Sequence, residues 1–164
     1  MDTTVYVRLT EIATCLCAEY ADGNDAGLPG LCFCGVVSGD EASFDYLGDC
    51  SDRCGMGWVR LVSAQPWTGI GVESTEPGNC SSLLGLTVEV GVYRCAHVMG
   101  SDGVPPTEEE MLAETQLQIA DMMAMRRAIV CCGGSKDFVL GAYTPIGPEG
   151  AAVGGTWDVL MMEV

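Results

Sequence analysis

The chain has 164 residues and a mass of 17.2 kDa, and its length and 48% hydrophobic content predict one folded domain spanning residues 1–164. Twenty-three acidic residues against seven basic ones give a formal net charge of −16. A surface this acidic repels phosphates, which excludes a protein that reads nucleic-acid sequence. The single histidine, His97, excludes any site within one chain that needs several histidines.

Cysteine content conflicts with the absence of a targeting signal. No apolar run approaches the ~20 residues that span a bilayer, and residues 1–13 lack the basic start and apolar stretch of a secretory signal. We therefore expect neither a membrane segment nor secretion. The ten cysteines nevertheless give a density typical of an oxidising environment. Metal binding, buried free thiols, or a particle assembled in the cytoplasm and later released would each account for them.

The first half of the chain predicts a helix followed by strands. Thr3 or Thr4 begins the helix, whose apolar residues recur at helical spacing as far as Tyr20. Residues 86–93 alternate between apolar and other side chains, which is the period of a half-buried strand. The strands predicted along the whole chain span residues 31–37, 58–64, 86–92, 138–143 and 157–164.

A second, longer helix follows Pro105 and Pro106, with Thr107 and Glu110 predicted to form a capping box. The order of elements predicts the fold class α+β, a small single domain in which two helices pack on one face of a mainly antiparallel β-sheet. The apolar stripe predicted for the second helix comprises Leu112, Ile119, Met123 and Val130, with Ala113, Ala120 and Ala124 beside it.

Some apolar side chains exceed what this arrangement buries. Several lie off the stripe of the second helix, and the last strand is apolar on both faces, so both of its faces must be covered. Internal burial and oligomerisation are the two explanations, and we expect an oligomer. The candidate interface residues are Met122, Met125, Ile129, Trp157, Val159 and Met161.

Cysteine spacing leaves three hypotheses open: structural disulfides, buried free thiols and a bound zinc. Cys32 and Cys34 point to the same face of a strand, whereas Cys15 and Cys17 diverge on a helix and cannot jointly hold one metal. Cys50 and Cys54 are close enough to pair with each other or to clamp the neighbouring strand. A four-thiolate zinc site would use Cys32, Cys34, Cys50 and Cys54.

Two polar patterns have structural explanations that we favour over catalysis. Cys95 and His97 share one side of a strand and are a conceivable catalytic or ligand pair, but a strand-end histidine in an ordinary hydrogen bond is commoner. Glu108, Glu109 and Glu110 occupy the first turn of a helix, where negative charge is favourable. The sequence therefore predicts no catalytic residues and no cofactor.

A series of segments spread over nearly the whole chain carries a resemblance to a known family. They are Cys15–Cys17, Cys32–Val37, Asp45–Cys50, Cys54–Leu61, Val88–Cys95, the long helix ending in Cys131-Cys132, Gly141–Pro145 and Gly154–Trp157. In this order they resemble the tail terminators, the head-to-tail connector proteins of long-tailed phages of actinobacteria. The resemblance implies a small α+β domain and a structural virion protein of the phage neck, not an enzyme.

The resemblance also implies an assembly. Tail terminators form a hexameric ring that caps the tail tube, ends its polymerisation and joins it to the head-side connector or stopper proteins. A ring of six would carry a charge of about −96, so DNA would pass through its channel without sticking. Assembly in the host cytoplasm followed by release in the virion would explain the cysteines. Adaptor or stopper neck proteins, and a cysteine-rich zinc or redox protein, remain the alternatives.

Overall fold

The computed structural model describes residues 4–39, 54–66, 84–99, 103–132, 138–149 and 151–162. Cys50, and with it the Asp45–Cys50 segment of the resemblance, lies outside the described residues. A π-helical turn, η2 (Ala128–Cys132), continues the second helix. The helices and strands are α1 (Thr4–Ala18), β1 (Phe33–Val36), β2 (Met56–Pro66), β3 (Leu84–Cys95), α2 (Glu108–Arg127), β4 (Phe138–Glu149) and β5 (Ala152–Met162).

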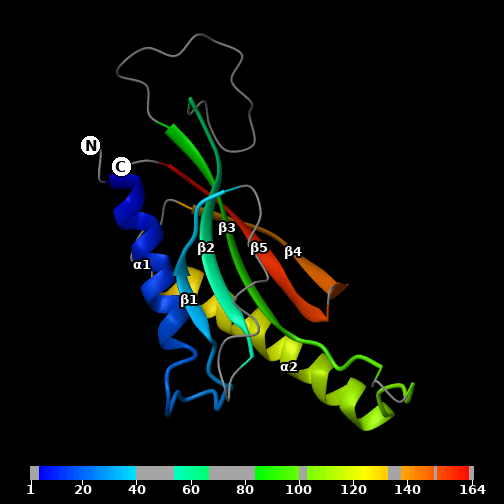
Figure 1. Ribbon diagram of the computed structural model, residues 1–164. Helices are drawn as coiled ribbons and strands as arrows, with labels where there is room; N and C mark the ends of the chain where they lie inside the picture. The colour runs from blue at the N-terminus through cyan, green and yellow to red at the C-terminus, as the bar shows by residue number, and fades with distance from the viewer. Residues whose placement is uncertain are drawn as a thin grey trace.

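The five strands form one sheet in the order β1-β2-β3-β5-β4. All neighbouring pairs are antiparallel except β1 and β2, which run parallel over four residues. Both helices pack on the same face of this sheet (Figure 1). The predicted fold class, α+β with two helices on one face of a mainly antiparallel sheet, is thereby confirmed.

The main core lies between the helices and the sheet. In α1, Leu9, Ile12 and Leu16 recur at helical spacing and are buried. In β3, Val88, Val90 and Val92 alternate with residues of the opposite face, and all three valines are fully buried. The apolar faces of α1 and β3 therefore belong to one buried core, to which α2 and β5 also contribute.

A smaller cluster covers the other face of the sheet. Met56 and Trp58 of β2 and Tyr93 of β3 are buried there, and the Trp58 and Tyr93 ring centroids lie 4.4 Å apart. The Trp58 ring lies directly against the backbone of Gly91, where a Cβ atom would overlap it. Gly91 therefore makes the close approach of this ring to the sheet possible.

The second helix begins as predicted but faces the sheet with the opposite side. Thr107 caps α2, and its hydroxyl and backbone form the reciprocal capping box with Glu110. Asp121, on the side opposite the predicted stripe, is buried and pairs with Arg94 of β3. Rotated in this way, α2 and η2 bury Ala124, Met125, Ala128 and Ile129. The predicted stripe is exposed instead, by 57% at Leu112, 55% at Ile119, 40% at Met123 and 42% at Val130.

Candidate functional site

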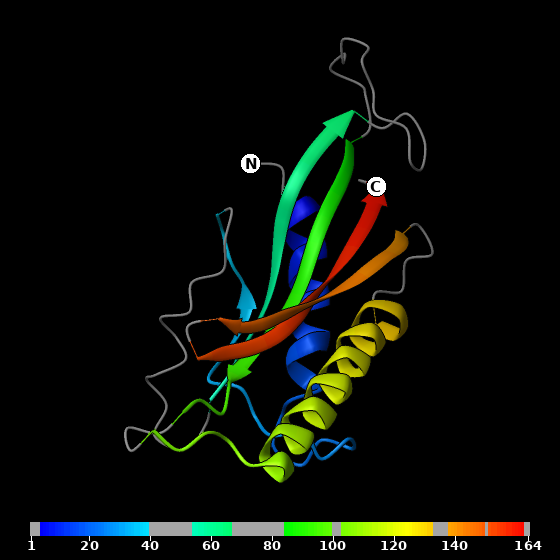
Figure 2. The same ribbon diagram turned by 90° about the vertical axis from the view of Figure 1, so that its right-hand side faces the viewer.

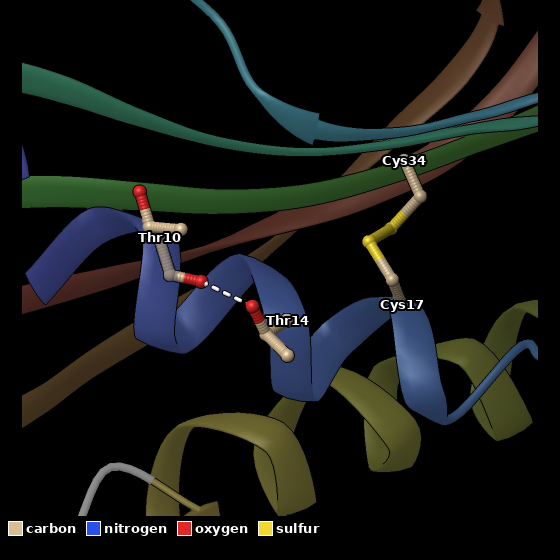
Figure 3. The surroundings of a disulfide bond; sticks show 4 residues. All are labelled: Thr10, Thr14, Cys17 and Cys34. Carbon is tan, nitrogen blue, oxygen red and sulfur yellow. Dashed lines mark hydrogen bonds between the residues drawn. A yellow bond between two sulfur atoms is a disulfide. The ribbon is translucent and has the colours of Figure 1, made fainter. Parts of the chain in front are cut away.

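Disulfide bonds join elements that are far apart in the sequence. Cys17 of α1 bonds to Cys34 of β1, with 5.6 Å between their Cα atoms (Figure 3). Cys54, just before β2, bonds to Cys95 at the end of β3, with a Cα separation of 5.7 Å. Beside the first of these bonds, Thr14 donates its hydroxyl to the backbone carbonyl of Thr10 one turn back in α1. Cys15 and Cys32 each form a disulfide bond as well.

These bonds overturn the four-thiolate zinc hypothesis. Cys32, Cys34 and Cys54 are disulfide-bonded, and a zinc ligand must be a thiolate. Cys50, the fourth proposed ligand, is outside the described residues. Within the described residues, no three His, Cys, Asp or Glu side chains come together in a way that could hold a metal ion. Structural disulfides are the hypothesis that this geometry supports.

His97 has an ordinary structural contact. Its Nδ1 atom lies 3.3 Å from Oε2 of Glu114, and its backbone N–H donates to the same oxygen at 2.8 Å. Cys95, its proposed catalytic partner, is held in the disulfide with Cys54. The histidine thus fastens the segment after β3 to α2, and the structural explanation is confirmed.

The acidic run at the start of α2 is also structural. Glu108, Glu109 and Glu110 all lie in the first turn and are exposed. Hydrogen bonds from the backbone N–H and then the hydroxyl of Thr107 hold the pKa of Glu110 below its ordinary value. Charge on Glu110 therefore stabilises the helix start, as expected for a capping box.

A cavity of about 120 Å³ lies between α2 and the neighbouring ends of β3 and β5. Its polar side chains already have partners within the chain. Arg94 donates from Nε and Nη2 to the two carboxylate oxygens of Asp121, at 2.6 and 2.9 Å. Gln118 donates to the backbone carbonyl of Gly154, and His97 and Glu114 contact each other. These contacts hold α2 against the sheet.

The pair of Arg94 and Asp121 sits beside a buried tyrosine. The Arg94 guanidinium carbon lies 5.5 Å from the centre of the Tyr20 ring. Burial, and next the neighbouring charge of Asp121, raise the pKa of Tyr20 well above its ordinary value. The Tyr20 hydroxyl therefore stays protonated at neutral pH.

A second ion pair lies on the opposite face of the sheet. Arg60 donates from Nε to Oε1 of Glu89 at 2.6 Å, and Trp58 donates to the same oxygen at 3.0 Å. Burial alone would raise the pKa of Glu89, but the hydrogen bonds from Arg60 and Trp58 outweigh it and hold the pKa below the ordinary value of 4.5. The charged form is thus the one that the fold stabilises.

We expect the free energy of unfolding to depend on the charge of Glu89 in acid. Because its pKa is lower in the folded chain than in the unfolded one, its contribution is complete above pH 4.5 and is lost as the pH falls through the folded-state value. Urea titrations between pH 6 and 3 should show a shallower acid loss for Glu89→Gln than for the unchanged chain. Asp25→Asn, which alters an exposed loop carboxylate, is the control. Parallel curves for Glu89→Gln and the unchanged chain would contradict the prediction.

Four of the six predicted oligomer-interface residues lie in the interior of the single chain. Met125, Ile129, Val159 and Met161 are buried inside the single chain, because α2 turns that side towards the sheet. The other two, Met122 and Trp157, are half-buried and contact each other, since the indole N–H donates to the Met122 carbonyl at 3.1 Å. The apolar stripe that was predicted to face the core is exposed instead; it comprises Leu112, Ile119, Met123 and Val130.

The sheet ends in two different edges. β4 is the last strand on one side, and among the described residues no strand pairs with its outer side. On the other side, β1 covers β2 only from Met56 to Val59. Residues 61–66 of β2 continue past β1 (Figure 2), and among the described residues their only partner strand is β3, with a register shift between Leu61 and Ser63. Leu61 to Ala64 are exposed. The backbone groups of both edges can accept a further strand.

Within the described residues, no helix is both long and apolar enough to cross a membrane. No protein-family model matches this chain, and no curated protein matches its sequence.

Proposed function

We propose that this chain is a structural subunit of the phage neck, a tail terminator that assembles into a closed ring. In this proposal six copies cap the tail tube, stop its growth and offer a surface to the head-side connector or stopper protein. DNA passes through the ring without being read. In this proposal the chain catalyses no reaction and binds no cofactor. It is a component of the virion.

The pair of unlike sheet edges is the observation that carries the proposal. A ring needs a heterologous contact, in which one surface of a subunit binds a different surface of the next. Residues 61–65 of β2 and residues 138–144 of β4 lie on opposite sides of one sheet and are free of proline. Pairing β4 of one copy with β2 of the next would extend the sheet from subunit to subunit and leave no edge open when the ring closes.

Composition and fold class give further support. The small α+β domain with helices on one face is the fold that the resemblance to tail terminators implies. A ring of six chains of −16 each would carry about −96, which suits a passage for DNA that must not bind it. The polar side chains of the described cavity are engaged with one another, which suits a structural protein.

Light scattering behind a sizing column tests the ring. We expect a species near 103 kDa, six times the 17.2 kDa of one chain, either alone or after addition of a purified tail-tube protein of a long-tailed actinobacteriophage. Leu61→Lys with Val62→Lys should block the β2 edge, and Val139→Lys with Ala142→Lys should block the β4 edge. All four positions are exposed, so the fold should be retained.

Mixing the two edge variants gives the sharpest result. Each variant keeps one intact edge, so a heterologous contact predicts that the mixture joins one copy of each variant through their sheets, whereas neither variant forms a sheet-edge contact alone. Val98→Lys, an exposed apolar position outside the sheet, should leave the ring intact. A strict monomer that ignores the tail-tube protein, or a ring insensitive to both edge variants, would reject the proposal.

A further inference from the structure

The exposed face of α2 has the pattern of a coiled-coil seam. Six exposed positions follow one another at alternating steps of four and three, the spacing that keeps one line of side chains facing a partner helix, and four of the six are apolar. This line lies opposite Asp121, which faces the sheet, so the fold of a single chain leaves it uncovered. We call it the α2 seam; it comprises Leu112, Gln116, Ile119, Met123 and Arg126 of α2 and Val130 of the π-helical turn η2 that continues it.

The seam fits a second copy of itself when the two helices run antiparallel. With the two-fold axis at the level of residue 121, Leu112 of one copy meets Val130 of the other, and Ile119 meets Met123. The same register brings Gln116 to Arg126, the two polar members of the seam. Every layer then pairs apolar with apolar or polar with polar, and the amide oxygen of Gln116 can accept from the guanidinium of Arg126.

Charge supports the same orientation. The first turn of α2 carries Glu108, Glu109 and Glu110, whereas its last turn carries Arg126 and Arg127. In an antiparallel pair the acidic first turn of one copy lies at the same end as the basic last turn of the other, offset by about 8 Å along the helix axis in this register, and the opposed helix dipoles add to the attraction. A parallel arrangement would bring like charges together.

Arg126 is available for such a contact. The other arginines of the described residues form ion pairs within the chain, namely Arg8 with Glu11, Arg60 with Glu89, Arg94 with Asp121 and Arg127 with Glu19. Arg126 is exposed at the surface of α2. We propose that two copies of this chain associate through antiparallel pairing of their α2 seams.

This contact is independent of the proposed ring. It is isologous, because the same surface is used by both copies, and a two-fold contact alone ends at a dimer. It uses none of the sheet-edge residues. Variants of the α2 seam and variants of the sheet edges therefore separate the two proposals.

Sedimentation equilibrium over a wide concentration range tests the dimer on the Leu61→Lys, Val62→Lys background, in which the ring contact is blocked. We expect a species near 34 kDa, twice the 17.2 kDa of one chain. Ile119→Glu should weaken this dimer about thirtyfold, the effect of losing a central apolar anchor. Val98→Glu is the matched control, because Val98 and Ile119 are both 55% exposed.

A charge exchange tests the register. Gln116→Arg should weaken the dimer because it faces Arg126 of the other copy, and adding Arg126→Glu to the same chain should restore it. A monomer at all concentrations would overturn the proposal. So would a dimer that Val98→Glu disrupts as much as Ile119→Glu does. A dimer that responds to Ile119→Glu but shows no rescue by the charge exchange would overturn the antiparallel register.

Discussion

Asp121→Ala is expected to lower the free energy of unfolding by about 3–5 kcal/mol, because it leaves the Arg94 guanidinium buried without a counter-charge. The side chains of Arg94 and Asp121 are 7% and 4% exposed and are joined by two hydrogen bonds. Within the described residues, the other hydrogen bond of the Arg94 guanidinium goes from Nη2 to the carbonyl of Pro29, at 3.1 Å. Urea denaturation followed by circular dichroism at pH 7 measures the change.

Two controls separate this effect from loss of an ordinary ion pair. Glu11→Ala removes the exposed pair with Arg8 and should change the free energy of unfolding by less than about 1 kcal/mol. Arg94→Met combined with Asp121→Leu replaces both charges with apolar groups and should recover most of the loss. If Asp121→Ala and Glu11→Ala have equal effects, the buried pair does not anchor α2 as we describe.

Loss of the disulfide bonds is the second large effect. Replacing Cys54 and Cys95 with serine is expected to lower the free energy of unfolding by about 4 kcal/mol, and replacing Cys17 and Cys34 by about 3 kcal/mol. The first pair is separated by 41 residues and the second by 17, so the first restrains the unfolded chain more. Urea denaturation of the two double variants without reductant measures both values.

Cys131→Ser provides the control for the cysteine variants. Cys131 is a free, exposed thiol in η2, the turn that continues α2. Its replacement should change the free energy of unfolding by less than about 0.5 kcal/mol. A loss of several kcal/mol in this control would show that serine itself disturbs the fold. Unchanged stability in both double variants would show that the bonds contribute nothing in solution.

Local patterns predicted the elements well. The alternation of Leu86 to Val92 identified β3, because one face of that strand is buried and the other is not. Thr107 and Glu110 identified the start of α2, because a capping box is satisfied within four residues. The strand β1 is shorter than its apolar run, since only Phe33 to Val36 pair with β2. The start of a helix and the buried face of a strand depend on residues that are close in the sequence. Both can therefore be predicted from one sequence.

The orientation of α2 could not be predicted in the same way. The helix is apolar on two sides, and helical periodicity is satisfied equally by burying Ile119 and Met123 or Met125 and Ile129. What decides between them is Arg94, on the helix-facing side of β3, which pairs with Asp121 27 positions later. A charged residue such as Asp121 is rarely buried unless it is paired, and its partner Arg94 lies in a distant strand. The same orientation buries Met125 and Ile129, which were predicted to lie at an oligomer interface.

The candidate assembly surfaces depend on strand order, which the sequence does not contain. An edge strand is identified only once its neighbours are known, and β5 pairs with β3 as well as β4. The cysteines illustrate the same limit. Spacing showed that Cys15 and Cys17 diverge on a helix, but only the packing of α1 beside β1 brings Cys17 to Cys34.

Pairing most of the arginines internally has a consequence for how the chains meet. Four of the five described arginines form ion pairs within the chain, and the chain carries a net charge of −16, so two approaching copies repel each other before any apolar contact forms. Dissolved salt shortens that repulsion to about 10 Å at 0.1 M ionic strength. We therefore expect the proposed contacts between copies to be weaker in dilute buffer than in moderate salt.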